Sequence, residues 1–190
     1  IVSSSFFWKF RHLYDSNWFE GYADKESDYY IKFFEENKIN STLDFGCASG
    51  STLFNLKSHN SNLIVYGIDV SKQAIDYCHN RFKKAFSDSY DFSQYLENQY
   101  LDVFLDKHKV IKFDLVMFDR VLCCITDNEM HSVLKILENK AEMILLDDFY
   151  QDQKKILYNG WRHRDWVEIF LEYGFELSFN NKTIYDNVSN

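Results

Sequence analysis

The sequence predicts an α/β fold in which a mostly parallel sheet carries helices on both faces. Two observations lead to this expectation. Short apolar runs alternate with helix-patterned segments along most of the 190 residues, and the run at 63–68 is apolar throughout, as in strands that are buried on both faces. A chain of this length suits one sheet with a substantial core, so we expect residues 1–190 to form a single domain.

The N-terminal segment, residues 1–40, is rich in aromatic side chains and turns helical over 25–37. Its aromatic residues around Tyr14, Trp18 and Tyr22 could fold over the core as a lid, or they could pack as part of an extra helix. Residues 41–190 are the expected core. Its first elements are a strand at 42–45, a loop at 46–50, a helix at 51–57, a strand at 63–68 and a helix to 84 capped by Ser71.

The second half continues the alternation. The expected elements are a strand at 91–96, a helix at 101–107, a strand at 113–118, a helix at 128–138, a strand at 142–146 and a helix at 164–173. Gly174 provides the stop for the last helix. The tail predicts an antiparallel hairpin, with strands at 175–179 and 182–188 joined by an Asn180-Asn181 turn. The sheet would then have seven strands.

The segment Leu43-Asp-Phe-Gly-Cys-Ala-Ser-Gly50 carries the strongest functional signal. It joins a strand to a helix, and ligands of open α/β sheets bind at the carboxyl ends of strands. Gly46 and Gly50 lack a Cβ, so we expect the backbone to approach a ligand closely there, beside the free N–H groups of the following helix. Asp44 adds a carboxylate that can contact a cationic ligand.

Asp69 ends the next strand, 19 residues after Gly50. A carboxylate at this position can accept hydrogen bonds from both hydroxyls of a ribose, each worth about 1.5–3 kcal/mol. The glycine-bearing loop and this acid together predict a site for a cofactor that contains adenosine.

These residues resemble the cofactor motifs of the class I S-adenosylmethionine-dependent methyltransferases. The family's first motif reads acid-x-Gly-x-Gly-x-Gly, and here Ala48 stands at the middle glycine. Segments 113–119 and 143–148 look like the family's later strand motifs, and the closing hairpin looks like its reversed last strand. The likeness spans about 42–179. It implies a Rossmann-like, mostly parallel seven-stranded sheet and S-adenosyl-L-methionine as cofactor.

The resemblance also implies roles for single residues. Asp44 and the 46–50 loop would contact the methionine part, and Asp69 the ribose. Glu97 is the candidate for adenine, with Asp102 as the second choice. The implied cofactor-binding set is Asp44, Gly46, Cys47, Ala48, Gly50, Asp69, Val70, Glu97, Asp119 and Arg120.

Two groups of residues are candidates on the substrate side. His163, in the segment after the fifth strand, could act as a general base, or it could be solvated at a helix start. Asp119 is the second catalytic candidate. Asp119, Asp147 and Asp148 end strands of one sheet and could hold a divalent metal, which looks like the arrangement in metal-dependent O-methyltransferases; they could equally be ordinary strand-end acids.

Composition limits the partners. The formal net charge of -8 disfavours a broad grip on nucleic acid, although a local basic patch could form around Lys154, Lys155, Arg162 and Arg164. No apolar run approaches the roughly 18–20 residues that span a bilayer. The four cysteines form no C-x-x-C pair, which favours a reducing, cytoplasmic setting. We expect no nucleic acid or membrane partner.

The preferred function is therefore methyl transfer to a small-molecule acceptor, with oxygen as the expected nucleophile. Two alternatives stay open: a metal-assisted methyltransferase acting on sugars or catechols, and an inactive cofactor-binding homologue that serves as a scaffold. N-methylation of a small amine is also possible, because an acidic pocket would suit it. A nicotinamide-dependent oxidoreductase is disfavoured because the G-x-G-x-x-G spacing is absent.

Overall fold

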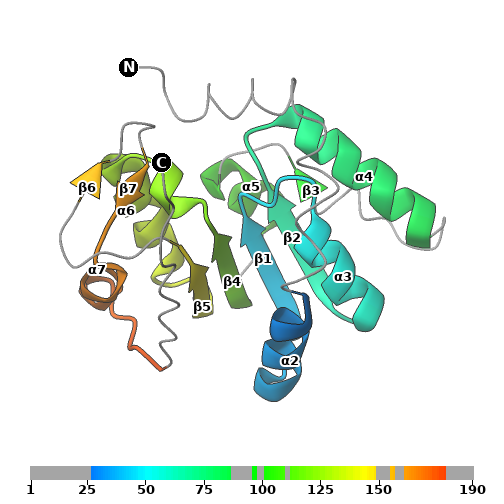
Figure 1. The fold of residues 1–190 in the computed structure, drawn as a ribbon, viewed down its shortest axis with the longest axis horizontal. Coiled ribbons are helices and arrows are strands. Elements are labelled where there is room, and N and C mark those ends of the chain that lie inside the picture. Colours follow the sequence, from blue (N-terminus) through cyan, green and yellow to red (C-terminus); the bar gives the residue numbers. More distant parts are fainter. Residues whose placement is uncertain are drawn as a thin grey trace, which may run out of the picture.

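The computed structural model of the chain describes residues 27–86, 96–97, 101–109, 112–148, 155–156 and 161–178. Their main sheet has the strand order β3-β2-β1-β4-β5, and all its pairs are parallel (Figure 1). Its strands are β1 (Ser41–Phe45), β2 (Ile64–Ile68), β3 (Leu96–Glu97), β4 (Phe113–Asp119) and β5 (Ala141–Asp147). A second, antiparallel sheet pairs β6 (Lys155–Ile156) with β7 (Arg162–His163).

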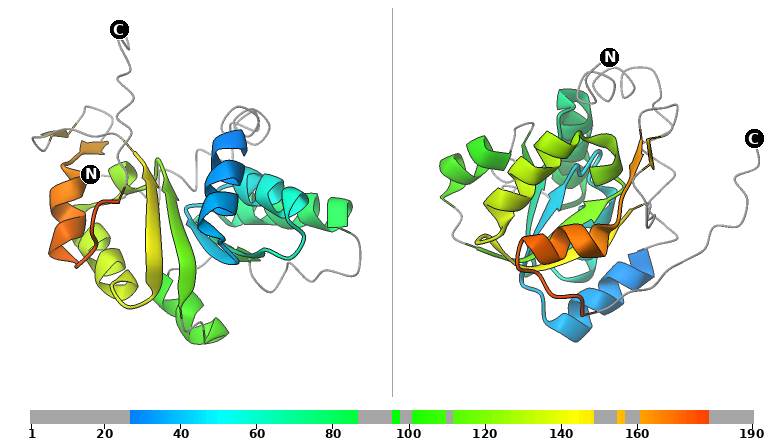
Figure 2. Two further views of the ribbon diagram at one scale, coloured as in Figure 1. Left: turned by 90° about the horizontal axis from the view of Figure 1, so that it is seen from below. Right: turned by 90° about the vertical axis from the view of Figure 1, so that its left-hand side faces the viewer.

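Helices cover both faces of the main sheet (Figure 2). One face packs against α2 (Ser27–Asn37), α3 (Ser51–His59) and α4 (Lys72–Phe86); the other packs against α5 (Leu101–His108), α6 (Asp127–Leu137) and α7 (Trp166–Glu172). Strand β4 serves both cores, because Leu115 and Met117 belong to the first and Val116 and Phe118 to the second. The predicted α/β class with helices on both faces is therefore confirmed.

The helix starts follow from local side-chain chemistry. Ser71 precedes α4, and its Oγ accepts a hydrogen bond from the Ala74 N–H at 3.3 Å, as predicted. Thr126 and Glu129 form a reciprocal capping box at the start of α6. Asp165 caps α7, so this helix begins at Trp166 and not at 164 as expected.

The strand count differs from the expectation of seven. In the described part of the chain the main sheet has five strands, and residues 175–178 form no strand there, so the predicted hairpin is not confirmed. The hairpin turn and second arm, at 179–190, lie outside the described residues, as do 91–95 of the predicted third strand.

The described helices are short. No described helix is long and apolar enough to cross a bilayer. The longest, α4, has 15 residues. It therefore extends roughly 22 Å, against a hydrocarbon core about 30 Å thick.

Candidate functional site

The site lies where the winding of the sheet reverses. Strands β1 and β4 are neighbours, although β2 and β3 come between them in the sequence. A crevice at the carboxyl ends of strands is expected at such a switch point. The segments that leave β1, β2, β4 and β5 meet at this edge, and they carry most of the residues singled out in the sequence.

The loop after β1 has an unusual backbone. Gly46, Ala48 and Gly50 adopt left-handed φ angles of 83°, 47° and 69°. Alanine in this region costs about 1–2 kcal/mol, so the surrounding contacts must impose the conformation. The N–H groups of Gly46 and Cys47 both donate to the carbonyl of Ile68, at 2.8 and 3.1 Å. The loop is thereby attached to the end of β2.

Asp69 is the second attachment of this loop. Its Oδ2 accepts the Ala48 N–H at 3.0 Å and its Oδ1 accepts the Ser71 N–H at 2.7 Å. The residue is only 9% exposed. Asp69 therefore links the loop after β1 to the segment that precedes α4. The predicted glycine loop and acid are brought together as expected.

Glycine is required at positions 46 and 50 for a different reason from the close ligand approach that we expect from the sequence. A Cβ on Gly46 would lie 2.6 Å from Cγ2 of Val121, and a Cβ on Gly50 would lie 2.2 Å from Sγ of Cys78. Protein atoms, and not space for a ligand, occupy the side where each side chain would stand. Both positions require glycine for tight packing and for their positive φ angles.

Asp44 is a buried acid, 5% exposed, near the end of β1. Burial first, and then the negative charges of Asp119 and Asp69, raise the pKa of its carboxyl well above the ordinary value. A cationic ligand group at this place would favour the ionised form. The arrangement therefore fits a sulfonium cofactor. Burial likewise raises the pKa of the neighbouring Cys47 thiol, which makes it an unreactive core group.

At the ends of β4 and β5 an arginine lies between two acids. The Nε of Arg120 is 3.2 Å from Oδ1 of Asp119, and its Nη2 is 4.0 Å from Oδ2 of Asp147. The Arg120 N–H donates to the Asp147 carbonyl at 2.7 Å, and its φ is 51°. Such left-handed residues gather at functional sites.

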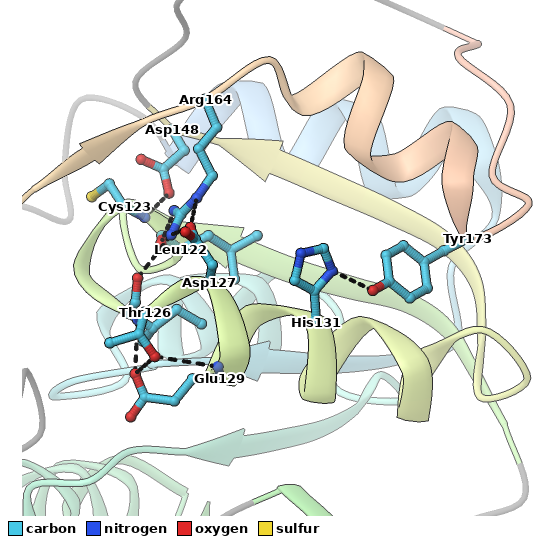
Figure 3. A network of polar contacts seen from close by, with 10 residues as sticks. Leu122, Cys123, Thr126, Asp127, Glu129, His131, Asp148, Arg164 and Tyr173 are labelled. Atoms are coloured by element: carbon cyan, nitrogen blue, oxygen red, sulfur yellow. Dashed lines mark hydrogen bonds and ion pairs between the residues drawn. The ribbon is translucent and has the colours of Figure 1, made fainter. Parts of the chain in front are cut away.

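Asp148 is engaged elsewhere, because its Oδ2 accepts the Cys123 N–H at 2.9 Å (Figure 3). The predicted metal triad is thus brought to one edge, but a guanidinium stands between two of its members. Among the residues that the structure describes, no cluster of three or more His, Cys, Asp or Glu side chains could hold a metal ion.

His163 and Arg164 do not begin a helix. His163 lies in β7, opposite Lys155, and is half-buried. Strand β7 lies against the short 3₁₀ turn η4 (Leu122–Cys124) that follows β4. Arg164 is 2% exposed, so it is not part of a basic surface patch. Both residues therefore lie beside the segment that follows β4.

The remaining predicted residues are less constrained. Val70 is half-buried directly after Asp69, and Glu97 lies in β3, where it pairs in register with Ile68 at the same edge. Asp102 is exposed on α5. Tyr14, Trp18, Tyr22 and Lys154 lie outside the described residues.

A cavity of about 270 Å³ lies away from this edge. It is lined by side chains of α2 and α3 and by residues that precede β1 and β2, such as Ile39 and Leu63. It is therefore at the amino ends of the strands, and we do not connect it with the loop after β1.

Sequence reasoning missed three participants. The Ser71 N–H holds Asp69, Val121 packs against Gly46, and Arg164 holds the η4 segment. The sequence predicts Ser71 only as a helix cap. The other two give no local signal, because their partners are distant in sequence.

Solved structures of similar fold have low sequence identity. The magnesium protoporphyrin IX methyltransferase of Synechocystis PCC 6803, solved with bound SAM, has a TM-score of 0.70 at 15% identity, over 98% of this chain and 94% of that one. An O-methyltransferase from a trans-AT PKS multienzyme of Brevibacillus brevis, in complex with S-adenosyl-L-homocysteine, has a TM-score of 0.60 at 14% identity. That match covers 90% of this chain and 59% of the other. These identities establish likeness of fold alone.

A putative caffeoyl-CoA O-methyltransferase of Staphylococcus aureus has a TM-score of 0.51 at 13% identity, over 72% of this chain and 63% of that one. No curated protein matches the sequence.

The doubly wound sheet defines a Rossmann-like fold, and the strained loop after β1 and the acid after β2 lie at the edge where such sheets bind ligands. Residues 43–141, just over half of the chain, match the family described as the methyltransferase domain. The chain belongs to the class I S-adenosylmethionine-dependent methyltransferase family.

Proposed function

We propose that this S-adenosylmethionine-dependent methyltransferase transfers its methyl group to an oxygen atom of a small molecule. The observation that carries the cofactor part of the proposal is the hydrogen bond between the Ala48 N–H and Asp69, which joins the loop after β1 to the acid after β2. These two motifs thereby form one polar surface at the switch point, where open α/β sheets bind their ligands.

The proposed contacts follow the geometry of this edge. Asp44 and the 46–50 loop take the methionine part, and the carboxylate of Asp69 takes the ribose. Glu97, or Asp102 in its place, lies on the adenine side. When bound, S-adenosylmethionine supplies the electrophilic methyl group. The protein's part is to hold the acceptor in line, and positioning alone can lower a barrier by about 7–11 kcal/mol.

Two residues are proposed for proton removal from the acceptor. Asp119 ends β4, and its side chain is 31% exposed, so it can face a substrate while paired with Arg120. His163 lies on β7 beside the segment that follows β4 and would act near neutral pH. The net charge of -8 supports a small molecule over a nucleic acid. Two proteins of similar fold are an O-methyltransferase and a putative caffeoyl-CoA O-methyltransferase, which supports oxygen as the acceptor atom.

Metal assistance is the less favoured route. Arg120 already places a permanent positive charge between the carboxylates of Asp119 and Asp147. We expect turnover that is unchanged by a chelator and flat in a Mg²⁺ titration. A loss of turnover on chelation, restored by Mg²⁺, would favour the metal-assisted alternative.

We further propose that residues 1–190 form one domain, with 1–40 adding to the core or covering the site. A reducing, cytoplasmic setting is supported by the cysteines, since Cys47, Cys78, Cys123 and Cys124 are all buried free thiols.

The test has two arms. Calorimetry with S-adenosylhomocysteine measures cofactor binding, and a metabolite extract with S-adenosylmethionine measures the release of S-adenosylhomocysteine. We expect both to be positive. Replacing His163 with Ala separates the two base candidates, because unchanged turnover leaves Asp119. Binding without turnover on any extract would favour the scaffold alternative, and absence of binding would refute the proposal.

A further inference from the structure

We infer that Arg164 is a positioning residue that holds the cofactor loop in its strained shape, acting through the segment after β4. The inference rests on the proposed function only for its effect on cofactor affinity. The mechanical link itself lies wholly within the described residues and can be measured without a ligand.

Arg164 is a buried guanidinium whose donors all point at one segment. Its Nη1 donates to the Leu122 carbonyl at 2.8 Å and its Nη2 to the Ile125 carbonyl at 3.0 Å. Its Nε and Nη2 also donate to Oδ1 of Asp127, at 3.0 and 2.8 Å. Figure 3 shows the Arg164 side chain reaching the turn from the segment that precedes α7. A planar fork of this kind fixes both ends of the turn at once.

The same turn has a second support from β5. Asp148 accepts the Cys123 N–H at 2.9 Å, between the two carbonyls that Arg164 binds (Figure 3). Leu122 and Cys123 are fully buried. The segment is therefore held by two residues that directly follow β7 and β5, and it has little freedom to relax while both contacts are present.

The turn reaches the cofactor loop through Val121. This residue directly precedes η4, and its Cγ2 would lie only 2.6 Å from a Cβ on Gly46, so Val121 packs directly against this glycine. Arg120, between the acids of β4 and β5, comes just before it. A shift of the turn must therefore move the surface that packs on the loop after β1.

The experiment compares the full chain with Arg164→Lys and Asp127→Asn. Lysine keeps the charge but loses the fork. The asparagine variant removes the carboxylate and leaves the bonds from Arg164 to both carbonyls. Lys57→Met is the matched control, because Lys57 is also buried, 1% exposed, and donates to the Leu63 carbonyl at 2.6 Å, but before β2 at the opposite edge.

Hydrogen exchange is measured first, without ligand, on peptides that cover 46–50 and 120–126. Arg164→Lys should speed exchange in both, by roughly tenfold or more, with no comparable change in α3. Lys57→Met should speed exchange near 61–63 and leave 46–50 as in wild type. Asp127→Asn gives a smaller change of the same kind, and it serves as the test if the lysine variant fails to fold.

S-adenosylhomocysteine binding is measured next. We expect Arg164→Lys to weaken it roughly tenfold or more, since small misplacements of binding groups carry penalties up to 10²-fold; Lys57→Met should bind as wild type. Exchange at 46–50 that is unchanged in both site variants overturns the inference, whatever the ligand does. If wild type itself does not bind, the proposed function fails, while the exchange data still decide the link from Arg164 to the loop.

Discussion

Replacing Asp69 with Asn tests the contact between the loop after β1 and the acid after β2. Both carboxylate oxygens accept backbone N–H groups, from Ala48 at 3.0 Å and from Ser71 at 2.7 Å. An amide has one oxygen and one NH₂, so in either orientation a donor faces a donor. One nearly buried N–H loses its acceptor, and we expect the free energy of unfolding to fall by about 1–3 kcal/mol.

The same substitution should weaken the cofactor. A hydrogen bond from a ribose hydroxyl to a charged acceptor is worth about 1.5–3 kcal/mol. At about 1.4 kcal/mol per tenfold change in Kd, the loss corresponds to roughly 10- to 150-fold weaker binding. The assay is calorimetric titration with S-adenosylhomocysteine, at a temperature where urea unfolding shows the variant to be fully folded.

The control is Asp76→Asn. Asp76 lies on the exposed side of α4 and pairs with Lys72 at 2.6 Å. We expect a change in unfolding free energy within about 0.5 kcal/mol and unchanged affinity. If Asp69→Asn loses stability yet binds as wild type, the acid only ties the loops together. If Asp69→Asn changes neither the unfolding free energy nor the Kd of S-adenosylhomocysteine, the reasoning about the contact between Asp69 and the loop is refuted.

Three further substitutions test the loop, the buried acid and a helix start. Gly50→Ala places a Cβ 2.2 Å from Cys78 Sγ at a left-handed φ, so urea unfolding should show a loss of about 2–5 kcal/mol; Gly174→Ala, at φ 78° with no atom within 4 Å, should lose only about 1–2 kcal/mol. For Asp44 the folded pKa is raised, so wild-type stability should fall as the pH rises from the ordinary value of 3.8 through that raised pKa. Asp44→Asn should remove this fall; thermal unfolding between about pH 3 and 8 measures it, and parallel profiles would contradict it. Thr126→Ala should lower the unfolding free energy by about 1 kcal/mol while Thr126→Ser should not, and equal urea midpoints for all three proteins would count against the cap.

Local patterns predicted the elements that local chemistry determines. The helix at 101–107 was expected and is observed as Leu101–His108. The predicted cap at Ser71 is present because a hydroxyl before a helix meets its free N–H groups wherever the chain goes next. The order of glycines and acids around β1 and β2 also predicted that these residues lie close together, because the strand ends of a parallel sheet meet at one edge.

The sequence could not reveal contacts between distant segments. Arg164 resembled a surface cation, yet its partners Leu122, Ile125 and Asp127 lie 37 to 42 positions earlier in the chain. His163 resembled a helix start because the true cap, Asp165, follows only two positions later in the sequence. In both cases the deciding interaction is tertiary, and no periodicity encodes it.

The glycines show the same limit. A sequence shows that residues 46 and 50 lack a side chain, but it does not show which neighbour requires this. The neighbours are Val121 from the segment after β4 and Cys78 from α4. A cofactor loop and a tight packing contact therefore look alike in one dimension.

The buried acid at the end of β1 links stability to ligand charge. Burial and the negative charges of Asp119 and Asp69 disfavour the ionised form of Asp44. The ligand-free protein is therefore destabilised when Asp44 loses its proton. A sulfonium offsets that cost, whereas the thioether of S-adenosylhomocysteine carries no such charge. The ratio of the Kd of S-adenosylhomocysteine to that of S-adenosylmethionine should therefore rise as the pH increases through the folded pKa of Asp44. In Asp44→Asn the ratio should not vary with pH, and a flat ratio in wild type would mean that this carboxylate does not face the sulfonium.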